Sequence, residues 1–107
     1  MKLPAKIKVG GLDFRVEAWA QPSARGSQRF GEFSAAEELI RVQVADRSPM
    51  FVLEVLLHEI VHAIWWVGGL RNGDDEERCA QVMGPAWAQI FRDNPELVAF
   101  IQDSVRG

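Results

Sequence analysis

The sequence is short of the residues on which many functional sites depend. Its 107 residues include one cysteine, two histidines and no tyrosine. The single cysteine, Cys79, excludes a disulfide within the chain and is typical of a reducing compartment. We therefore expect the protein to be cytoplasmic.

Signals for nucleic acid, secretion or a membrane are also lacking. The formal net charge is −3 and the basic residues are scattered, so nothing favours a nucleic-acid partner. Residues 1–6 contain no apolar stretch of the kind that a signal peptide needs. Residues 50–67 are long enough to cross a bilayer, but four ionisable residues near their middle argue against a membrane helix. We expect a single soluble domain, residues 1–107.

The first half of the chain shows the two-residue repeat of apolar side chains that indicates β-strands. The predicted strands are residues 6–9, 12–19, 30–34 and 39–44. Gly10-Gly11 between the first two predicts a hairpin, and residues 21–28, rich in Pro, Ser, Gly and Arg, are typical of a loop. The pattern predicts three or four antiparallel strands with one face for a helix to cover.

The longest predicted helix lies in the middle of the chain. Ser48-Pro49 suits its N-cap and first position, and Gly68-Gly69 suits its end. Residues 50–67 between them are apolar except for Glu54, two histidines and a second glutamate. A helix that is apolar nearly all round is buried, so we expect this one to cover the sheet.

Two more helices are predicted after it. The pattern from residue 75 to residue 92 is helical, with a kink or break expected near Gly84-Pro85 because proline removes a backbone donor. Asn94 and Pro95 suit the N-cap and first position of a short last helix. The elements together predict an α+β fold, with a small antiparallel or mixed sheet of three to four strands covered by three helices.

The motif that carries chemistry is His58-Glu59-Ile60-Val61-His62, inside the longest helix. Residues four apart lie on one helix face, so His58 and His62 can direct two imidazole nitrogens at one tetrahedral Zn²⁺. Glu59 lies about 100° around the helix from His58, where it can accept a proton from the water that the metal activates. The alternative is a chance match with both histidines packed in the core. Buried histidines and a buried carboxylate need polar partners, which favours the metal.

A catalytic zinc needs a third protein ligand. With no third histidine, the candidates are a carboxylate or Cys79, although a small buried cysteine is ordinarily core. Four acidic residues, 74–77, begin the second helix, and a helical count of 100° per residue puts Glu76 in the middle of its apolar face. Glu77 lies at the edge of that face and suits the N3 position after an Asp74 cap. We predict Glu76 as the third ligand. The two glutamates exchange roles if the first turn is distorted.

The motif followed by a glutamate on a later helix resembles the gluzincin clan of zinc peptidases. At this size the chain is most similar to the single-domain minigluzincins and to small HExxH proteins of phages and prophages, and residues 6–11, 56–64 and 93–97 resemble blocks of that group. The resemblance implies a mixed sheet, an active-site helix and a glutamate helix around one zinc. The family usually supplies a tyrosine or histidine to stabilise the oxyanion, and this chain has neither to spare. The groups that could stabilise the oxyanion instead are Arg71, Arg78 or a tryptophan N–H.

The function expected from these residues is a zinc-dependent metallopeptidase with Glu59 as general base, acting on a peptide or protein held along an edge strand, either residues 30–34 or residues 39–44. Two alternatives stay open. One is a zinc-binding protein of the same fold without turnover. The other is a protein-interaction module, for which Trp65-Trp66 could form an exposed patch, although adjacent tryptophans on a buried helix are more often core.

Overall fold

One four-stranded sheet and three helices make up the part of the chain that the structure describes, residues 2–19 and 30–106 of a computed structural model. The elements in order are β1 Lys6–Val9, β2 Leu12–Trp19, β3 Gly31–Ser34, β4 Leu39–Gln43, α1 Pro49–Val67, α2 Glu76–Asp93 and α3 Pro95–Arg106. The predicted α+β class, all four predicted strands and all three predicted helices are confirmed. The predicted loop, residues 21–28, lies outside the described residues.

The sheet is mixed, with the strand order β1-β2-β4-β3. β1 and β2 form the predicted antiparallel hairpin, and β3 pairs antiparallel with β4. The central pair, β2 and β4, is parallel. Of the two sheets expected, antiparallel or mixed, the mixed one is therefore confirmed, and the strand pattern that favoured antiparallel pairing is wrong at this pair. The alternation of apolar residues is the same in both directions and carries no information on orientation.

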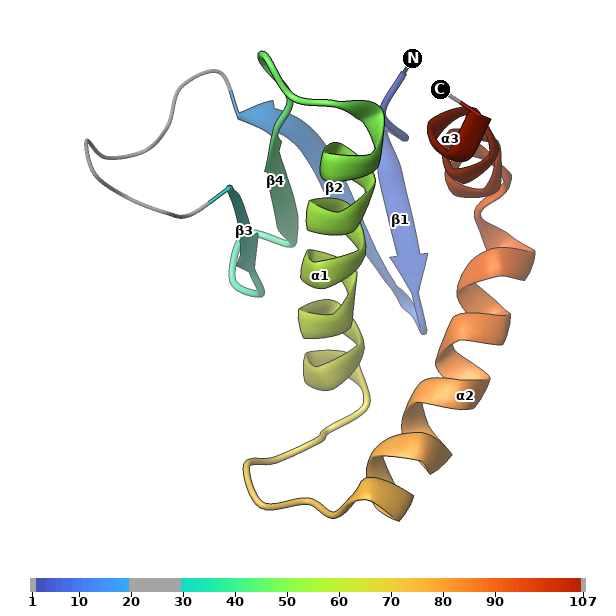
Figure 1. Ribbon diagram of the computed structural model, residues 1–107. Helices are drawn as coiled ribbons and strands as arrows, with labels where there is room; N and C mark the ends of the chain where they lie inside the picture. The colour runs from blue at the N-terminus through green and yellow to red at the C-terminus, as the bar shows by residue number, and fades with distance from the viewer. Residues whose placement is uncertain (1, 20–29, 107) are drawn as a thin grey trace.

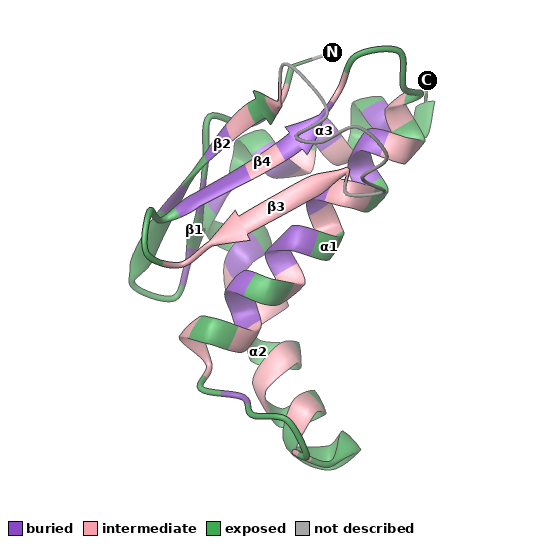
Figure 2. Ribbon diagram, turned by 90° about the vertical axis from the view of Figure 1, so that its left-hand side faces the viewer, coloured by how far each residue is buried: buried purple, intermediate pink, exposed green. Residues whose placement is uncertain are grey.

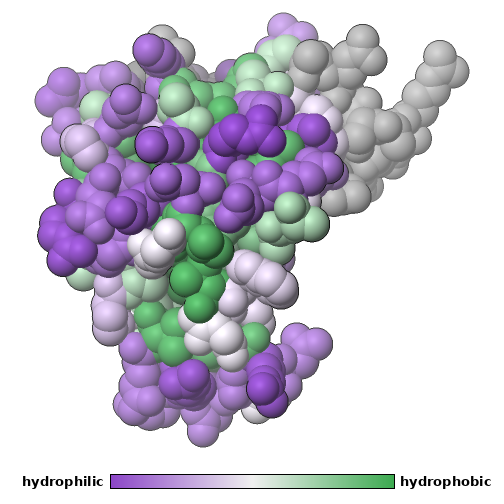
Figure 3. All heavy atoms as spheres, turned by 180° about the vertical axis from the view of Figure 1, so that it is seen from behind, coloured by the Kyte–Doolittle hydropathy of each residue, from purple (hydrophilic) through white to green (hydrophobic). Residues whose placement is uncertain are grey.

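All three helices cover one face of the sheet, with α1 lying across its middle (Figure 1). The core joins strand residues to one side of α1 and to the last two helices. Its largest fully buried side chains include Ile7, Phe14, Ile40, Leu56, Ile60, Ile64, Ile90, Leu97 and Phe100. The opposite face of the sheet is open and hydrophilic (Figure 3), and Arg41 there lies within 4.0 Å of three carboxylates, those of Glu17, Glu32 and Glu37. The fold therefore has two layers, with the functional motif on the helical one.

Both ends of α1 follow the predicted signals. The Ser48 hydroxyl accepts a hydrogen bond from the Phe51 N–H at 3.2 Å, Pro49 is the first helical residue, and Gly68 is the C-cap. Gly69 follows with φ +68°, a left-handed conformation that favours glycine. This turn brings the chain back beside the end of α1.

The expectation that α1 is buried nearly all round is wrong. Residues at four-residue intervals form an exposed stripe along the helix: Met50, Glu54, His58, His62 and Trp66. Three helices on a four-stranded sheet do not enclose α1, so one of its faces stays open. α1 is long and apolar enough to cross a membrane, but the core helix of a soluble protein passes the same test, and the buried face of α1 packs on the sheet.

The second helix lacks the break that was one alternative predicted at Gly84-Pro85, and it begins at a different N-cap. It runs unbroken through Pro85, which is exposed, as is Gln81, the residue whose carbonyl loses its partner to the proline. Its N-cap is Asp75, not Asp74, since the Asp75 carboxylate accepts from the Arg78 N–H at 2.8 Å. Ile90 is its one buried residue, and its N-terminal half extends beyond the sheet (Figure 2).

The two edges of the sheet are treated differently. The β1 edge is covered by side-chain amides: Asn94 accepts from the Lys8 N–H at 2.8 Å and donates to the Lys8 carbonyl at 2.9 Å. Gln89 donates to the same carbonyl and accepts from the Gly10 N–H at 2.8 Å. The Asn94 side chain thus binds β1 rather than capping α3 as expected. Among the described residues β3 pairs with β4 alone, so its other edge faces outward.

Candidate active site

The two histidines meet on the open face of α1. Their Nε2 atoms lie 3.3 Å apart, with the rings at 75° to one another, and both side chains are exposed. Two Zn–N bonds of about 2.0–2.1 Å at a tetrahedral angle place their nitrogens about 3.3 Å apart. The separation also suits a weak N–H···N hydrogen bond between neutral rings. The distance between the two nitrogens is therefore compatible with two zinc ligands and with a hydrogen bond between the rings.

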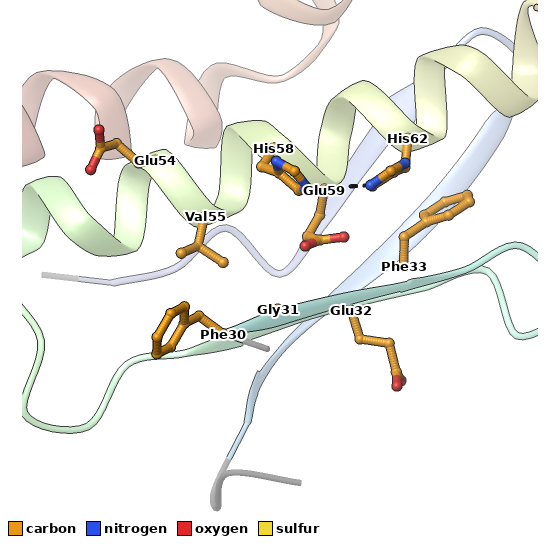
Figure 4. A pocket seen from close by; sticks show the side chains of 9 residues that line it. All are labelled: Phe30, Gly31, Glu32, Phe33, Glu54, Val55, His58, Glu59 and His62. Carbon is orange, nitrogen blue, oxygen red and sulfur yellow. Dashed lines mark hydrogen bonds between the residues drawn. The ribbon is translucent and has the colours of Figure 1, made fainter. Parts of the chain in front are cut away.

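Glu59 lies on the neighbouring side of the helix and faces the sheet. It is 6% exposed, and its carboxylate points toward β3 (Figure 4). Gly31 makes room for it there: a Cβ at position 31 would lie 2.8 Å from Glu59 Oε2 and 2.6 Å from Val55 Cγ1. Real Cβ atoms do not approach other atoms so closely, so any side chain at this position would have to displace Val55 or Glu59. Sequence reasoning did not find Gly31; a glycine inside a predicted strand was the available signal.

A cleft of about 590 Å³ is lined by residues of α1 and of β3, and it contains the motif. It is lined by Phe30, Gly31, Glu32, Phe33, Glu54, Val55, His58, Glu59 and His62. The Phe33 ring lies nearly parallel to the His62 imidazole, with a centroid distance of 6.4 Å and an interplanar angle of 20°. The cleft thus combines the predicted base and histidines with an apolar wall and a strand edge.

One end of the cleft is held by an aromatic cluster. The rings of Phe30 and Phe51 pack edge to face at 5.0 Å, and the Arg47 guanidinium lies 4.8 Å from both centroids. These contacts join the start of β3 to the first turn of α1. They fix the spacing between the two walls.

Glu76, the predicted third ligand, does not lie beside His58 and His62 in this structure. Glu76 and Glu77 are the first two residues of α2, and both are exposed. Glu76 therefore does not lie on a buried face, because none of the helices and strands that the structure describes covers this part of α2. Glu77 is not the N3 residue of an Asp74 cap either, since Asp74 instead accepts from the Arg71 N–H at 2.6 Å. In residues 2–19 and 30–106, no three His, Cys, Asp or Glu side chains form a group that could hold a metal, Cys79 included.

Two of the substitutes considered for the oxyanion stabiliser lie near the motif. Arg71 and the pair Trp65-Trp66 line a recess that begins at His62. Arg78 is exposed on the first turns of α2, and it does not line the cleft or the recess.

Comparison of the chain with protein-family models, with curated proteins and with solved structures finds no match. The site is therefore interpreted from its own residues.

Proposed function

We propose that this protein is a zinc-dependent metallopeptidase. The observation that carries the proposal is the 3.3 Å separation of the His58 and His62 Nε2 atoms beside the buried carboxylate of Glu59, all three on one cleft. Two imidazole nitrogens suit Zn²⁺, and a carboxylate next to them suits a general base. The resemblance of the motif to gluzincins supports the same conclusion.

His58 and His62 would hold the metal, and Glu76 would complete the site only if the first turn of α2 moved toward α1 from the position that it has in this structure. Zn²⁺, when bound, lowers the pKa of a water ligand and polarises a peptide carbonyl. Glu59 takes a proton from the attacking water and delivers it to the nitrogen of the leaving amine. Burial between α1 and β3 holds the carboxylate in one place for both transfers.

The outward edge of β3 offers a place for the substrate backbone. An extended peptide added to this edge would form main-chain hydrogen bonds with β3 and lie over the cleft. The opposite edge, β1, is already bonded to Asn94 and Gln89. We therefore propose a peptide or protein substrate bound at β3, in the cytoplasm, with neither nucleic acid nor a membrane as partner.

The test compares two glutamates of the same cleft. Purified protein should contain about one zinc per chain, and His62→Ala should abolish it. Glu59→Gln should keep the metal and lose peptide hydrolysis by about 10²–10⁴-fold. Glu54→Gln, exposed one turn before His58, is the matched control and should stay active. Full zinc content in His62→Ala, or undiminished cleavage by Glu59→Gln, would contradict the proposal.

A second candidate is zinc binding without turnover. The absence of tyrosine from the chain favours it, because the oxyanion then lacks one of its usual donors. A zinc-dependent rise in melting temperature, without cleavage of a peptide mixture, would distinguish this function from the first.

A further inference from the structure

The cleft continues beyond His62 into a second hollow of about 400 Å³, which we call the tryptophan recess. Its walls include Phe33, His62, Trp65, Trp66, Leu70 and Arg71. Phe33 and His62 line both hollows. They lie side by side toward the C-terminal end of α1 (Figure 4), so the recess begins where the cleft around Glu59 ends.

Two adjacent tryptophans leave apolar surface open at the recess. Trp66 is 60% exposed and Trp65 is half-buried, contrary to the expectation that this pair is core. A contiguous exposed apolar patch is typical of a binding site, whereas a single exposed apolar side chain is not informative. Phe33 and Leu70 add apolar surface on the other walls.

One cation stands among these apolar groups. The Arg71 backbone N–H is bonded to Asp74, which fixes the turn after α1, while its guanidinium forms no ion pair with the residues that the structure describes. Gly69, with φ +68°, turns the chain so that Leu70 and Arg71 return to the end of the helix. The recess thus has an apolar body and a positive group.

The register of β3 connects the recess to the cleavage site. Gly31 lies against Glu59, and Phe33, two residues further along the strand, lies beside His62. Side chains two apart on a strand share a face and lie about 6.6–6.8 Å apart. In a peptide paired with β3, two side chains on the same face, two residues apart, would therefore lie one beside Glu59 and the next at the entrance of the recess.

We propose that the tryptophan recess is a substrate subsite that takes a bulky apolar side chain, with Arg71 binding a carboxylate next to it. This proposal rests on the proposed function, since it assumes a peptide along β3. The carboxylate belongs either to an adjacent acidic residue or to the C-terminus of the peptide, and both present the same chemistry to a guanidinium.

The experiment measures binding, so that it does not depend on turnover. The Glu59→Gln protein, with zinc added, is titrated with four peptides of one alanine-rich scaffold, amidated at the C-terminus and carrying Phe-Asp, Phe-Lys, Ala-Asp or Ala-Lys. Phe-Asp should bind about tenfold more tightly than Ala-Asp and about threefold more tightly than Phe-Lys. A fifth peptide that ends in Phe with a free carboxylate separates the two sources of negative charge.

Two variants assign the preferences to residues. Trp66→Ala should remove the preference for Phe and keep that for Asp, and Arg71→Gln should do the reverse. Phe91→Ala and Arg78→Gln, both on α2 away from the recess, are the matched controls and should keep both preferences. Equal binding of all four peptides, or preferences that survive in both variants, would overturn the subsite. Failure of the parent protein to cleave any peptide would instead count against the proposed function, and the binding preferences would still be measured.

Discussion

At the scale of single residues, the contact between Gly31 and Glu59 decides where the proposed base lies. Glu59 belongs to α1 and Gly31 to β3, so the two walls of the cleft meet at this point. Val55, one turn before Glu59, packs on the same bare Cα. A side chain at position 31 would press on both.

Gly31→Ala tests this contact. The added methyl group must displace Val55 or Glu59, and overpacking of this kind costs about 1–3 kcal/mol of unfolding free energy. We also expect peptide hydrolysis to fall, because the carboxylate shifts. Urea denaturation and activity measure the two effects. Gly11→Ala is the control, since a Cβ there meets nothing within 4 Å, and it should stay within about 0.5 kcal/mol of the parent.

The pKa of Asp93 predicts how the free energy of unfolding changes between pH 4 and pH 2. The Arg92 guanidinium and the Gln89 amide donate hydrogen bonds to its carboxylate and lower its pKa to about 2. A group whose pKa is lower in the folded state stabilises the fold above its unfolded pKa of about 3.9, and this contribution is lost as the pH falls toward 2. Asp93→Asn should therefore lose less stability than the parent between pH 4 and pH 2 in urea titrations. The effect is small because the group is exposed. An Asp103→Asn control on α3 should follow the parent, and identical slopes in all three proteins would contradict the assignment.

At the scale of elements, the structure separates what local signals determine from what they do not. Both ends of α1 were predictable because Ser48-Pro49 and Gly68-Gly69 act through their own backbone neighbours. The parallel pairing of β2 with β4 was not, because it depends on where the chain re-enters the sheet. The histidine pair was predictable from helical spacing alone. Gly31 was not, because its role depends on a helix that follows it in the chain.

The prediction for Glu76 shows the same limit. A helical count places residues around an axis, but burial needs another element to cover the chosen face. Among the described residues nothing covers the first turn of α2, residues 76–78, and Asp75 rather than Asp74 is the N-cap. Both acidic residues are good caps, so sequence alone does not choose between them.

Zinc provides a test of α2. If Glu76 completes the site, the N-terminal half of α2 must approach α1, and its amides should exchange more slowly once zinc is added. Glu76→Ala should weaken zinc binding by more than the roughly 10–100-fold typical of outer-shell partners and should abolish the slowing. Glu77→Ala, its exposed neighbour, should retain both. Loss of zinc affinity in Glu77→Ala but not in Glu76→Ala would assign the ligand to Glu77. If zinc does not slow amide exchange in α2 of any of the three proteins, α2 supplies no ligand.

At the scale of the whole molecule, the two sheet edges have different roles. Side chains from α2 and from its junction with α3 occupy the β1 edge, and this makes β3 the edge at which another strand can add. Asn94 is the central residue of this closure, since it is buried and also donates to the Ile90 carbonyl at 2.8 Å.

Asn94→Ala should destabilise the protein strongly. It removes the partner of the Lys8 N–H, the donor to the Ile90 carbonyl and one of the two side-chain donors to the Lys8 carbonyl, which keeps Gln89. Each buried polar group left unpaired costs about 1–3 kcal/mol. Urea denaturation measures the loss. Asn72→Ala, at an exposed turn position, should change stability by less than about 0.5 kcal/mol. Equal stability of the two variants would show that the β1 edge does not need this closure.

The hydrogen bonds between Lys8 and Asn94 join residues 86 positions apart, which has a consequence for synthesis. A ribosome adds roughly 5–20 residues per second, so β1 emerges seconds before Asn94 is made. During that time the backbone groups of the β1 edge lack their partners and can pair with strands of neighbouring nascent chains. The β1 edge is therefore open to pairing with another chain during translation and closed in the folded protein, and a chaperone that binds extended segments would cover it in the interval.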